Sequence, residues 1–231
     1  MPAISFSCVS FSYSSEPLLE NISFTVSDGE RVCIVGPNGS GKSTLLRLAT
    51  GELFPDRGSI TVPEHGVLPA AGSSESIATS IKGYLDAVCA ETLDALCRFE
   101  SVNEAMAQDG VETGSLAEDY DSLLARLEVL DAWNLPARRA EALAGLGLGQ
   151  VDASRLVSSL SPGQRGRLEL AALLLSSGQA LVLDEPTNHL DAGSSDYLSH
   201  MMVSWPGPVL FTTHDRAFID EVATAVVDLD T

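Results

Sequence analysis

The sequence has few basic residues for its length. Thirteen Lys and Arg stand against 32 Asp and Glu among 231 residues, which gives a formal net charge of −19 at pH 7. A surface of this charge repels the phosphates of nucleic acids and of anionic membranes over most of its area. We therefore do not expect a broad nucleic-acid binder, and any RNA contact must depend on a small local patch or on another part of a larger protein.

Long apolar runs are also missing. The longest ones, such as Leu170–Leu175 and Ala180–Leu183, are far shorter than the ~20 residues of a transmembrane helix. The first residues have neither the basic region nor the apolar region of a signal peptide. These absences predict a cytoplasmic protein with no membrane span.

The four cysteines form no recognisable motif. Cys8, Cys33, Cys89 and Cys97 show no C-x-x-C spacing, and Cys33 lies inside an apolar strand pattern. Such cysteines are typical of a reducing compartment, where a free thiol packs like a small apolar side chain. We expect all four to be reduced and most to be in the core.

Strand and helix patterns alternate along most of the chain. Strand patterns occupy residues 4–9, 22–26, 31–35 and 58–62, with a helix over 42–50. From residue 158 onward the expected order is helix, strand, helix, strand, helix and strand, over 162–176, 180–183, 194–203, 208–212, 215–223 and 225–229. This alternation predicts an α/β fold with a mostly parallel sheet covered by helices.

Residues 76–132 differ from the rest, because they contain almost no strand signal. They have apolar residues at helical spacing, with turn residues at Asp109-Gly110 and Thr113-Gly114. Twelve acidic and three basic side chains make this segment strongly negative. It is predicted to be a helical hairpin inserted in the α/β domain.

A glycine-rich segment after the strand at 31–35 fits the pattern G-x-x-x-x-G-K-S/T. It comprises Gly36, Pro37, Asn38, Gly39, Ser40, Gly41, Lys42 and Ser43, and Thr44 follows it. Glycines allow successive backbone N–H groups to face one concavity, and the next helix adds its positive N-terminal end. Lys42 then places a charge at the β and γ phosphates, while the Ser43 hydroxyl ligates Mg²⁺. The segment predicts a P-loop that binds ATP, Thr44 included.

Two carboxylates follow the apolar strand at 180–183. The strand delivers Asp184 to the rim of the sheet beside the P-loop, where it can hold Mg²⁺ through water. Glu185 points elsewhere, as strand alternation requires, and is placed to polarise a water in line with the γ-phosphate. The alternative is an ordinary acidic turn.

Three further segments resemble the motifs of ATP-binding cassette (ABC) ATPases. Leu160-Ser161-Pro162-Gly163-Gln164 resembles their signature, the stretch from Asp184 to Asp191 their Walker B motif and D-loop, and His214-Asp215-Arg216-Ala217-Phe218 their switch histidine region. The resemblance covers about residues 4–229. The sequences of the last two segments are most similar to those of ABC-F proteins. The sequence Leu-Asp-Ala-Trp-Asn-Leu at 130–135, followed by Ala-Gly-Leu-Gly-Leu at 144–148, also resembles the N-terminal cassette of that subfamily.

The resemblance implies a fold and its division. Residues 1–231 would form one ABC nucleotide-binding domain of the P-loop NTPase class, with an antiparallel β edge subdomain. A helical, arm-like insertion would occupy 73–150, and a helical region with the signature would extend from 151 to about 178.

The resemblance also implies further site residues. Glu185 and His214 would be catalytic, with His214 sensing the γ-phosphate, and the ring of Tyr13 would stack on adenine. Asp191 would either bridge to the P-loop of a partner cassette or only cap the next helix.

The signature has a physical interpretation of its own. Ser161 can cap a helix that starts at Pro162, because proline is favoured at the first helical position. In the family, Ser161, Gly163 and Gln164 would contact ATP bound to the opposing cassette. ATP hydrolysis would then require two cassettes.

Two positions depart from the family pattern. Pro162 replaces the second signature glycine and removes one N–H group, although proline is compatible with a helix start. The Gln that normally follows a short strand is absent, and Ala70 and Ala71 occupy the matching stretch. Water can replace that amide on Mg²⁺, so the expected consequence is an altered rate of hydrolysis or altered coupling.

The leading hypothesis is an ABC-F type ATPase that uses ATP and Mg²⁺ to open and close two cassettes. The second cassette is expected in the same native chain, otherwise in a second copy, and the ribosome is a candidate partner. One alternative is the ATPase subunit of a membrane transporter, and another is an ATP-gated binding module with little turnover.

Overall fold

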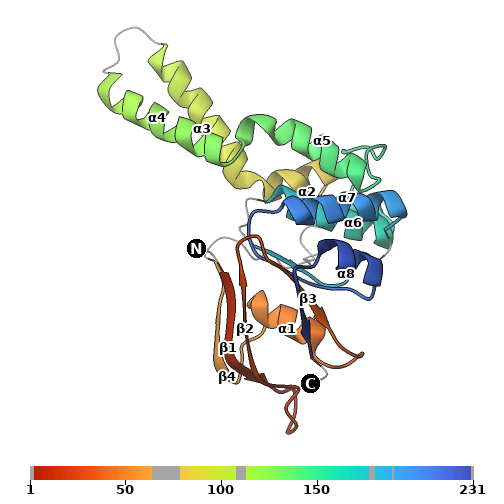
Figure 1. Ribbon diagram of the computed structural model, residues 1–231. Helices are drawn as coiled ribbons and strands as arrows, with labels where there is room; N and C mark the ends of the chain where they lie inside the picture. Colours follow the sequence, from red (N-terminus) through yellow and green to blue (C-terminus); the bar gives the residue numbers. More distant parts are fainter. Residues whose placement is uncertain (1–2, 64–78, 108–112, 177–179, 189, 230–231) are drawn as a thin grey trace. The chain divides into compact units, whose positions relative to one another are not determined.

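The computed structural model describes residues 3–63, 79–107, 113–176, 180–188 and 190–229. The chain forms two compact units (Figure 1). Unit 1 comprises residues 1–72 and 178–231, and unit 2, the helical unit, comprises residues 73–177. The predicted insertion at 73–150 and signature region from 151 to about 178 stay predictions, and Ala70 and Ala71 lie outside the described residues.

Unit 1 begins with an antiparallel sheet. Its strands are β1 (Ala3–Phe11), β2 (Leu19–Ser27) and β4 (Arg57–Thr61), in the order β2-β1-β4. Apolar residues of β1 such as Ile4 and Phe6 are buried on one face of the sheet. This sheet corresponds to the predicted antiparallel edge subdomain.

A parallel sheet forms the other layer of unit 1. It consists of β3 (Arg31–Val35), β5 (Leu181–Leu183), β6 (Val209–Thr212) and β7 (Ala225–Asp228), in the order β5-β6-β3-β7. Because all four strands are parallel, their carboxyl ends lie at the same edge. Ligands of open α/β sheets bind at that edge.

Helix α1 (Lys42–Ala49) packs between the two sheets of unit 1 (Figure 1). Its buried residues Leu45, Leu46 and Leu48 share one apolar core with both sheets. This burial fixes the first turn of α1 at the end of β3. Helices α7 (Ala192–Ser204) and α8 (Arg216–Val222) pack against each other and complete the unit.

The helical unit contains five α-helices in its described part. They are α2 (Ile81–Val88), α3 (Ala90–Met106), α4 (Thr113–Val129), α5 (Leu135–Gly145) and α6 (Pro162–Leu175), with short 3₁₀ turns at Ala132–Asn134 and Val157–Ser159. Helices α3 and α4 lie side by side and run in opposite directions (Figure 1), which confirms the predicted hairpin. The ring of Phe99 of α3 contacts the rings of Tyr120 of α4 and Trp133.

Most predicted elements are confirmed to within two residues. In the helical unit, however, the apolar pattern predicted as the first helix of the hairpin belongs to two helices, α2 and α3, which meet at Cys89. Helix α5 was not predicted, since its sequence Leu-Pro-Ala-Arg-Arg-Ala-Glu-Ala-Leu-Ala-Gly has no clear apolar stripe.

The expectation that most cysteines are in the core is wrong for two of them. Cys33 and Cys89 are buried, but Cys8 and Cys97 are exposed. Cys8 lies at a β-bulge with φ 51°, which interrupts the alternation of side chains along β1. Cys97 lies on the solvent-facing side of α3.

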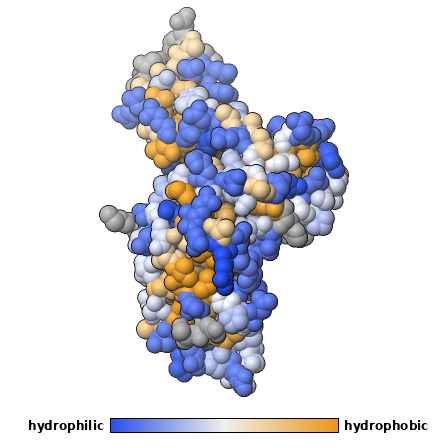
Figure 2. Space-filling view, turned by 45° about the vertical axis from the view of Figure 1, so that its right-hand side comes forward, coloured by the Kyte–Doolittle hydropathy of each residue, from blue (hydrophilic) through white to orange (hydrophobic). Residues whose placement is uncertain are grey.

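Hydrophilic residues predominate on the face drawn in Figure 2, and apolar residues gather in separate patches. Within the described part of the chain, no helix combines the length and apolar character that crossing a membrane requires.

Candidate active site

The loop between β3 and α1 requires glycine at two close approaches. Gly41 precedes α1 with φ 98°, and a Cβ there would lie 2.8 Å from Leu19 Cδ2. Gly36 has φ 149°, and a Cβ there would lie 2.7 Å from Ser40 Oγ. L-residues rarely adopt either conformation. The glycines therefore let the loop pack closely against Leu19 of β2 and against its own residue Ser40.

Lys42 is the cation of this loop. Its ammonium group donates hydrogen bonds to the carbonyl oxygens of Gly36, at 2.8 Å, and Pro37, at 2.9 Å. Nearby, Ser40 Oγ is buried and has no hydrogen-bond partner among the residues that the structure describes. A buried polar atom without a partner is costly, and a phosphate oxygen would supply one.

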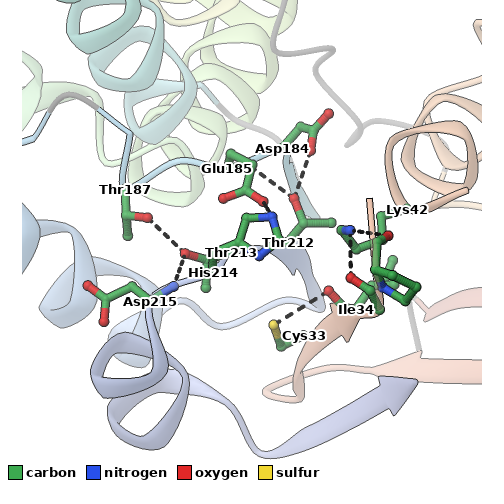
Figure 3. Close-up of polar contacts among 12 residues, drawn as sticks. Cys33, Ile34, Lys42, Asp184, Glu185, Thr187, Thr212, Thr213, His214 and Asp215 are labelled. Carbon is green, nitrogen blue, oxygen red and sulfur yellow. Dashed lines mark hydrogen bonds and ion pairs between the residues drawn. The ribbon is translucent and has the colours of Figure 1, made fainter. Parts of the chain in front are cut away.

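Asp184 and Glu185 follow β5 at the carboxyl edge of the parallel sheet. Asp184 Oδ1 accepts a hydrogen bond from the Thr212 hydroxyl at 2.7 Å, and the Glu185 N–H donates to the same hydroxyl oxygen at 3.0 Å. Glu185 has φ 49°, a left-handed conformation that is uncommon for residues other than glycine. This turn directs its side chain away from that of Asp184 (Figure 3).

His214 follows β6 at the same edge. Its Nε2 lies 3.2 Å from Glu185 Oε1, and the two side chains point toward each other (Figure 3). A second hydrogen bond links the loop after β5 to the loop after β6, because the hydroxyls of Thr187 and Thr213 are 2.8 Å apart. The Asp215 N–H also donates to Thr213 Oγ1.

A cleft of about 470 Å³ connects these groups within unit 1. Its lining includes nine residues predicted from the sequence: Asn38, Gly39, Gly41, Lys42, Ser43, Thr44, Asp184, Glu185 and His214. Leu18 and Asn188 also line it and were not predicted. Its volume is in the range of small-molecule sites.

Tyr13 follows the end of β1, the central strand of the antiparallel sheet, and is 61% exposed. Its ring packs edge-on against Phe11, with centroids 4.9 Å apart, and its hydroxyl lies 3.5 Å from Thr44 Oγ1. The preceding residue, Ser12, is held by Asp56, which accepts hydrogen bonds from its N–H and its hydroxyl. The ring of Tyr13 is thus free to stack on a planar group.

Two other predicted residues have structural roles at helix starts. Asp191 caps α7 by accepting a hydrogen bond from the Ser194 N–H at 2.9 Å. In the helical unit, Ser161 caps α6 and forms a reciprocal capping box with Gln164, which confirms the predicted cap. Pro162 is the first residue of α6, and Gly163 follows in its first turn.

Cys33 lies in β3 and belongs to the core behind the site. Burial raises the pKa of its thiol to about 11, and the nearby charge of Glu185 acts in the same direction. A hydrogen bond with the Thr213 backbone lowers the pKa in part. The thiol is therefore inert at neutral pH and is no nucleophile for this site.

A family model described as ABC transporter matches residues 19–188, which include the P-loop and the Asp184-Glu185 pair. The chain belongs to the ABC transporter family. It is an ATP-binding cassette, and the cassettes of this family are ATPases. The predicted fold class, an α/β P-loop NTPase of the ABC type, is confirmed.

Curated relatives resemble the cassette over nearly its whole length. It is 32% identical over 228 residues to ABC transporter F family member 2 of Arabidopsis thaliana, covering 96% of this chain and 34% of that protein. It is 36% identical over 221 residues to the energy-dependent translational throttle protein EttA of Mycobacterium tuberculosis, covering 94% and 39%. The chain therefore spans roughly a third to two-fifths of the length of these relatives.

A solved structure supports the fold of the cassette. The structure of an ATP binding subunit of an ABC transporter matches it with a TM-score of 0.67 at 19% identity, covering 97% of this chain and 85% of that one. The predicted resemblance to ABC-F cassettes agrees with the curated relatives.

Thr212 is the main site residue that sequence reasoning missed. A signal was available, because Thr212 is the only polar residue in the strand Val-Leu-Phe-Thr that leads to His214. A polar group at the end of a buried strand needs a partner, and here the partners are Asp184 and Glu185.

Proposed function

We propose that this cassette binds Mg-ATP in the cleft of unit 1 and hydrolyses it with Glu185 and His214. The single observation that supports this most strongly is that one cleft is lined by Lys42, Asp184, Glu185 and His214, which follow three different strands. A cation, two carboxylates and an imidazole at the carboxyl edge of a parallel sheet suit phosphoryl transfer.

The residues present fit a nucleotide. The backbone N–H groups from Asn38 to Ser43 and the Lys42 ammonium would bind the phosphates, and Ser40 Oγ would gain the partner it lacks among the described residues. The exposed ring of Tyr13 offers a face for adenine.

The residues also fit Mg²⁺, because this ion prefers oxygen ligands and retains several waters. The Ser43 hydroxyl and the Asp184 carboxylate would hold it in the cleft. Bound there, the ion neutralises phosphate charge and orients the terminal phosphate.

Glu185 orients the attacking water and accepts its proton, since its carboxylate lines the cleft and is only partly exposed. His214, within hydrogen-bond distance of Glu185 Oε1, holds that carboxylate in place. On this basis we assign Glu185 as the catalytic base and His214 as the residue that positions it.

The test of nucleotide binding uses the chain's two lysines. Lys42→Ala should weaken ATP binding at least ~10-fold, or ~1.4 kcal/mol, because it removes a charge directed at the phosphates. Lys82→Ala is the matched control, because Lys82 is a helix-surface residue paired with Asp86. Calorimetric titration of both variants decides the point, and equal affinities would refute the P-loop assignment.

We further propose that each ATP is shared between two cassettes. The capped N-terminus of α6, with Ser161, Gly163 and Gln164, is suited to receive the γ-phosphate of ATP on a partner, and Asp191 to approach the partner's P-loop. Sedimentation of Glu185→Gln with Mg-ATP tests this: an ATP-dependent dimer identifies a second copy as partner, and a monomer points to a different cassette.

A cytoplasmic role on the ribosome is proposed because one relative is named a translational throttle protein. The net charge of −19 opposes general RNA binding, so contact with a ribosomal protein or a single basic spot is expected. Co-sedimentation of Glu185→Gln with ribosomes and Mg-ATP, but no binding to duplex RNA at low salt, is the expected result.

A further inference from the structure

Thr212 is the last residue of β6 and lies next to the proposed catalytic loop. Its side chain is completely buried, with 0% exposure. In the parallel sheet it is paired with Ile34 of β3, which lies two residues before the first glycine of the P-loop. A buried hydroxyl at this position must have its hydrogen bonds satisfied by protein groups.

The hydroxyl of Thr212 makes two hydrogen bonds, and both go to the acidic pair (Figure 3). It donates to Asp184 Oδ1 at 2.7 Å and accepts from the Glu185 N–H at 3.0 Å. A hydroxyl can donate only one hydrogen bond. An ionised carboxylate can only accept hydrogen bonds, and an N–H group can only donate one. The direction of both bonds is therefore fixed.

These two bonds hold the backbone between Asp184 and Glu185, from which the two carboxylates point in different directions. The bond to the Glu185 N–H fixes the plane of the peptide that joins Asp184 to Glu185. From that plane Glu185 turns with φ 49° and reaches His214 at 3.2 Å. A left-handed conformation of a residue with a Cβ persists only where its surroundings impose it.

The next residue along the chain has different contacts. The hydroxyl of Thr213 contacts Thr187 and the Asp215 N–H, and neither of these contacts involves Asp184 or Glu185. Both threonines are buried. Of the two, Thr212 is the one that joins β6 to the acidic pair.

We propose that Thr212 is a positioning residue of the ATPase site. Its hydroxyl orients the Asp184 carboxylate and the peptide group between Asp184 and Glu185. The proposal rests on the proposed function, since it assigns these two carboxylates to Mg²⁺ and to the attacking water. One buried hydroxyl thereby sets the relative placement of both groups, which perform different tasks.

The experiment compares Thr212→Val, which keeps the shape and removes the hydroxyl, with Thr212→Ser, which keeps the hydroxyl. We expect Thr212→Val to lower kcat at least ~10-fold, because small misplacements of reacting groups are costly. ATP affinity measured without Mg²⁺ should stay within about 3-fold, because the P-loop is unaltered. Thr212→Ser should restore kcat.

A second readout does not involve turnover. Amide hydrogen exchange of Glu185, measured by NMR on the nucleotide-free chain, should be faster in Thr212→Val and close to the parent in Thr212→Ser. Thr92→Val, at a buried threonine of α3, is the matched control and should leave both the exchange of Glu185 and kcat unchanged.

Unchanged kcat and unchanged exchange in a folded Thr212→Val variant would overturn the proposal. A loss of kcat that Thr212→Ser does not restore would also overturn it, because the loss would then come from the packing of the methyl group and not from the hydroxyl. If Thr212→Val does not fold, Thr212→Cys replaces it, since a thiol is a weak donor; kcat equal to that of Thr212→Ser then refutes the proposal. Absence of ATP turnover in a parent chain that does form an ATP-dependent dimer would, by contrast, contradict the proposed function itself, and the exchange of Glu185 would still test the role of Thr212.

Discussion

Glu185 Oε1 and His214 Nε2 lie 3.2 Å apart, although the two residues follow different strands of the parallel sheet. The contact depends on the left-handed turn at Glu185, which directs the carboxylate toward the loop after β6. The imidazole side chain is 64% exposed and the carboxylate 21%. His214 is therefore accessible from solvent, while Glu185 lies deeper in the cleft.

His214→Ala should reduce ATP turnover by about 10- to 100-fold and change ATP affinity little, because it removes the group that holds the Glu185 carboxylate. The melting temperature should not change, since His214 is exposed. The matched control is His200→Ala, at an exposed histidine of α7. Equal turnover in the two variants would remove His214 from the site.

Much of unit 1 could be predicted from the sequence because its signals are local. The strand at 31–35, the glycine-rich loop and the helix from Lys42 follow from short patterns. In the helical unit, the capping of α6 follows in the same way from Ser161 and Pro162. The position of Asp184 at the sheet edge followed from the apolar strand before it.

Other features could not be predicted because they depend on contacts between distant segments. The bond from Thr212 to Asp184 requires the register of β5 beside β6, which no local pattern specifies. The exposure of Cys8 depends on a bulge in the pairing of β1. The break at Cys89 interrupts an apolar pattern that continues across it.

Cysteine reactivity should divide the four thiols into two pairs. Cys8 and Cys97 are exposed and should react with iodoacetamide in the native chain at pH 8. Cys33 and Cys89 are buried, and with a pKa of about 11 only about 0.1% of Cys33 is thiolate at that pH. Peptide mass spectrometry after timed labelling measures this. Labelling of Cys33 at the rate of Cys8 would show that the core around β3 opens readily.

Asp86 should stabilise the helical unit in a pH-dependent way. Its carboxylate accepts hydrogen bonds from Lys82 and from Arg139 of α5, each at 2.6 Å. The bond from Lys82, together with that from Arg139, lowers the pKa of Asp86 below its usual 3.8. The folded chain therefore takes up this proton at lower pH than the unfolded chain. The stabilisation is fully present above pH 3.8 and is lost as the pH falls through the folded-state pKa.

Urea unfolding of Asp86→Asn tests this. The variant should lose about 1–3 kcal/mol at pH 7, because the largely buried Arg139 loses its charged partner, and the loss should shrink below pH 4. Asp94→Asn breaks the exposed pair with Arg98 and should cost at most ~0.5 kcal/mol. Equal costs for the two variants, or a cost for Asp86→Asn that does not depend on pH, would contradict this account.

We propose that Glu185 performs the chemistry in a cleft that binds ATP without it. The most direct measurement compares ATP turnover and ATP affinity in Glu185→Gln and in Glu20→Gln, at an exposed glutamate of β2. Glu185→Gln should bind ATP as the parent does and lose at least ~10²-fold in turnover, while Glu20→Gln should retain both. Turnover in Glu185→Gln equal to that of the parent would contradict the claim.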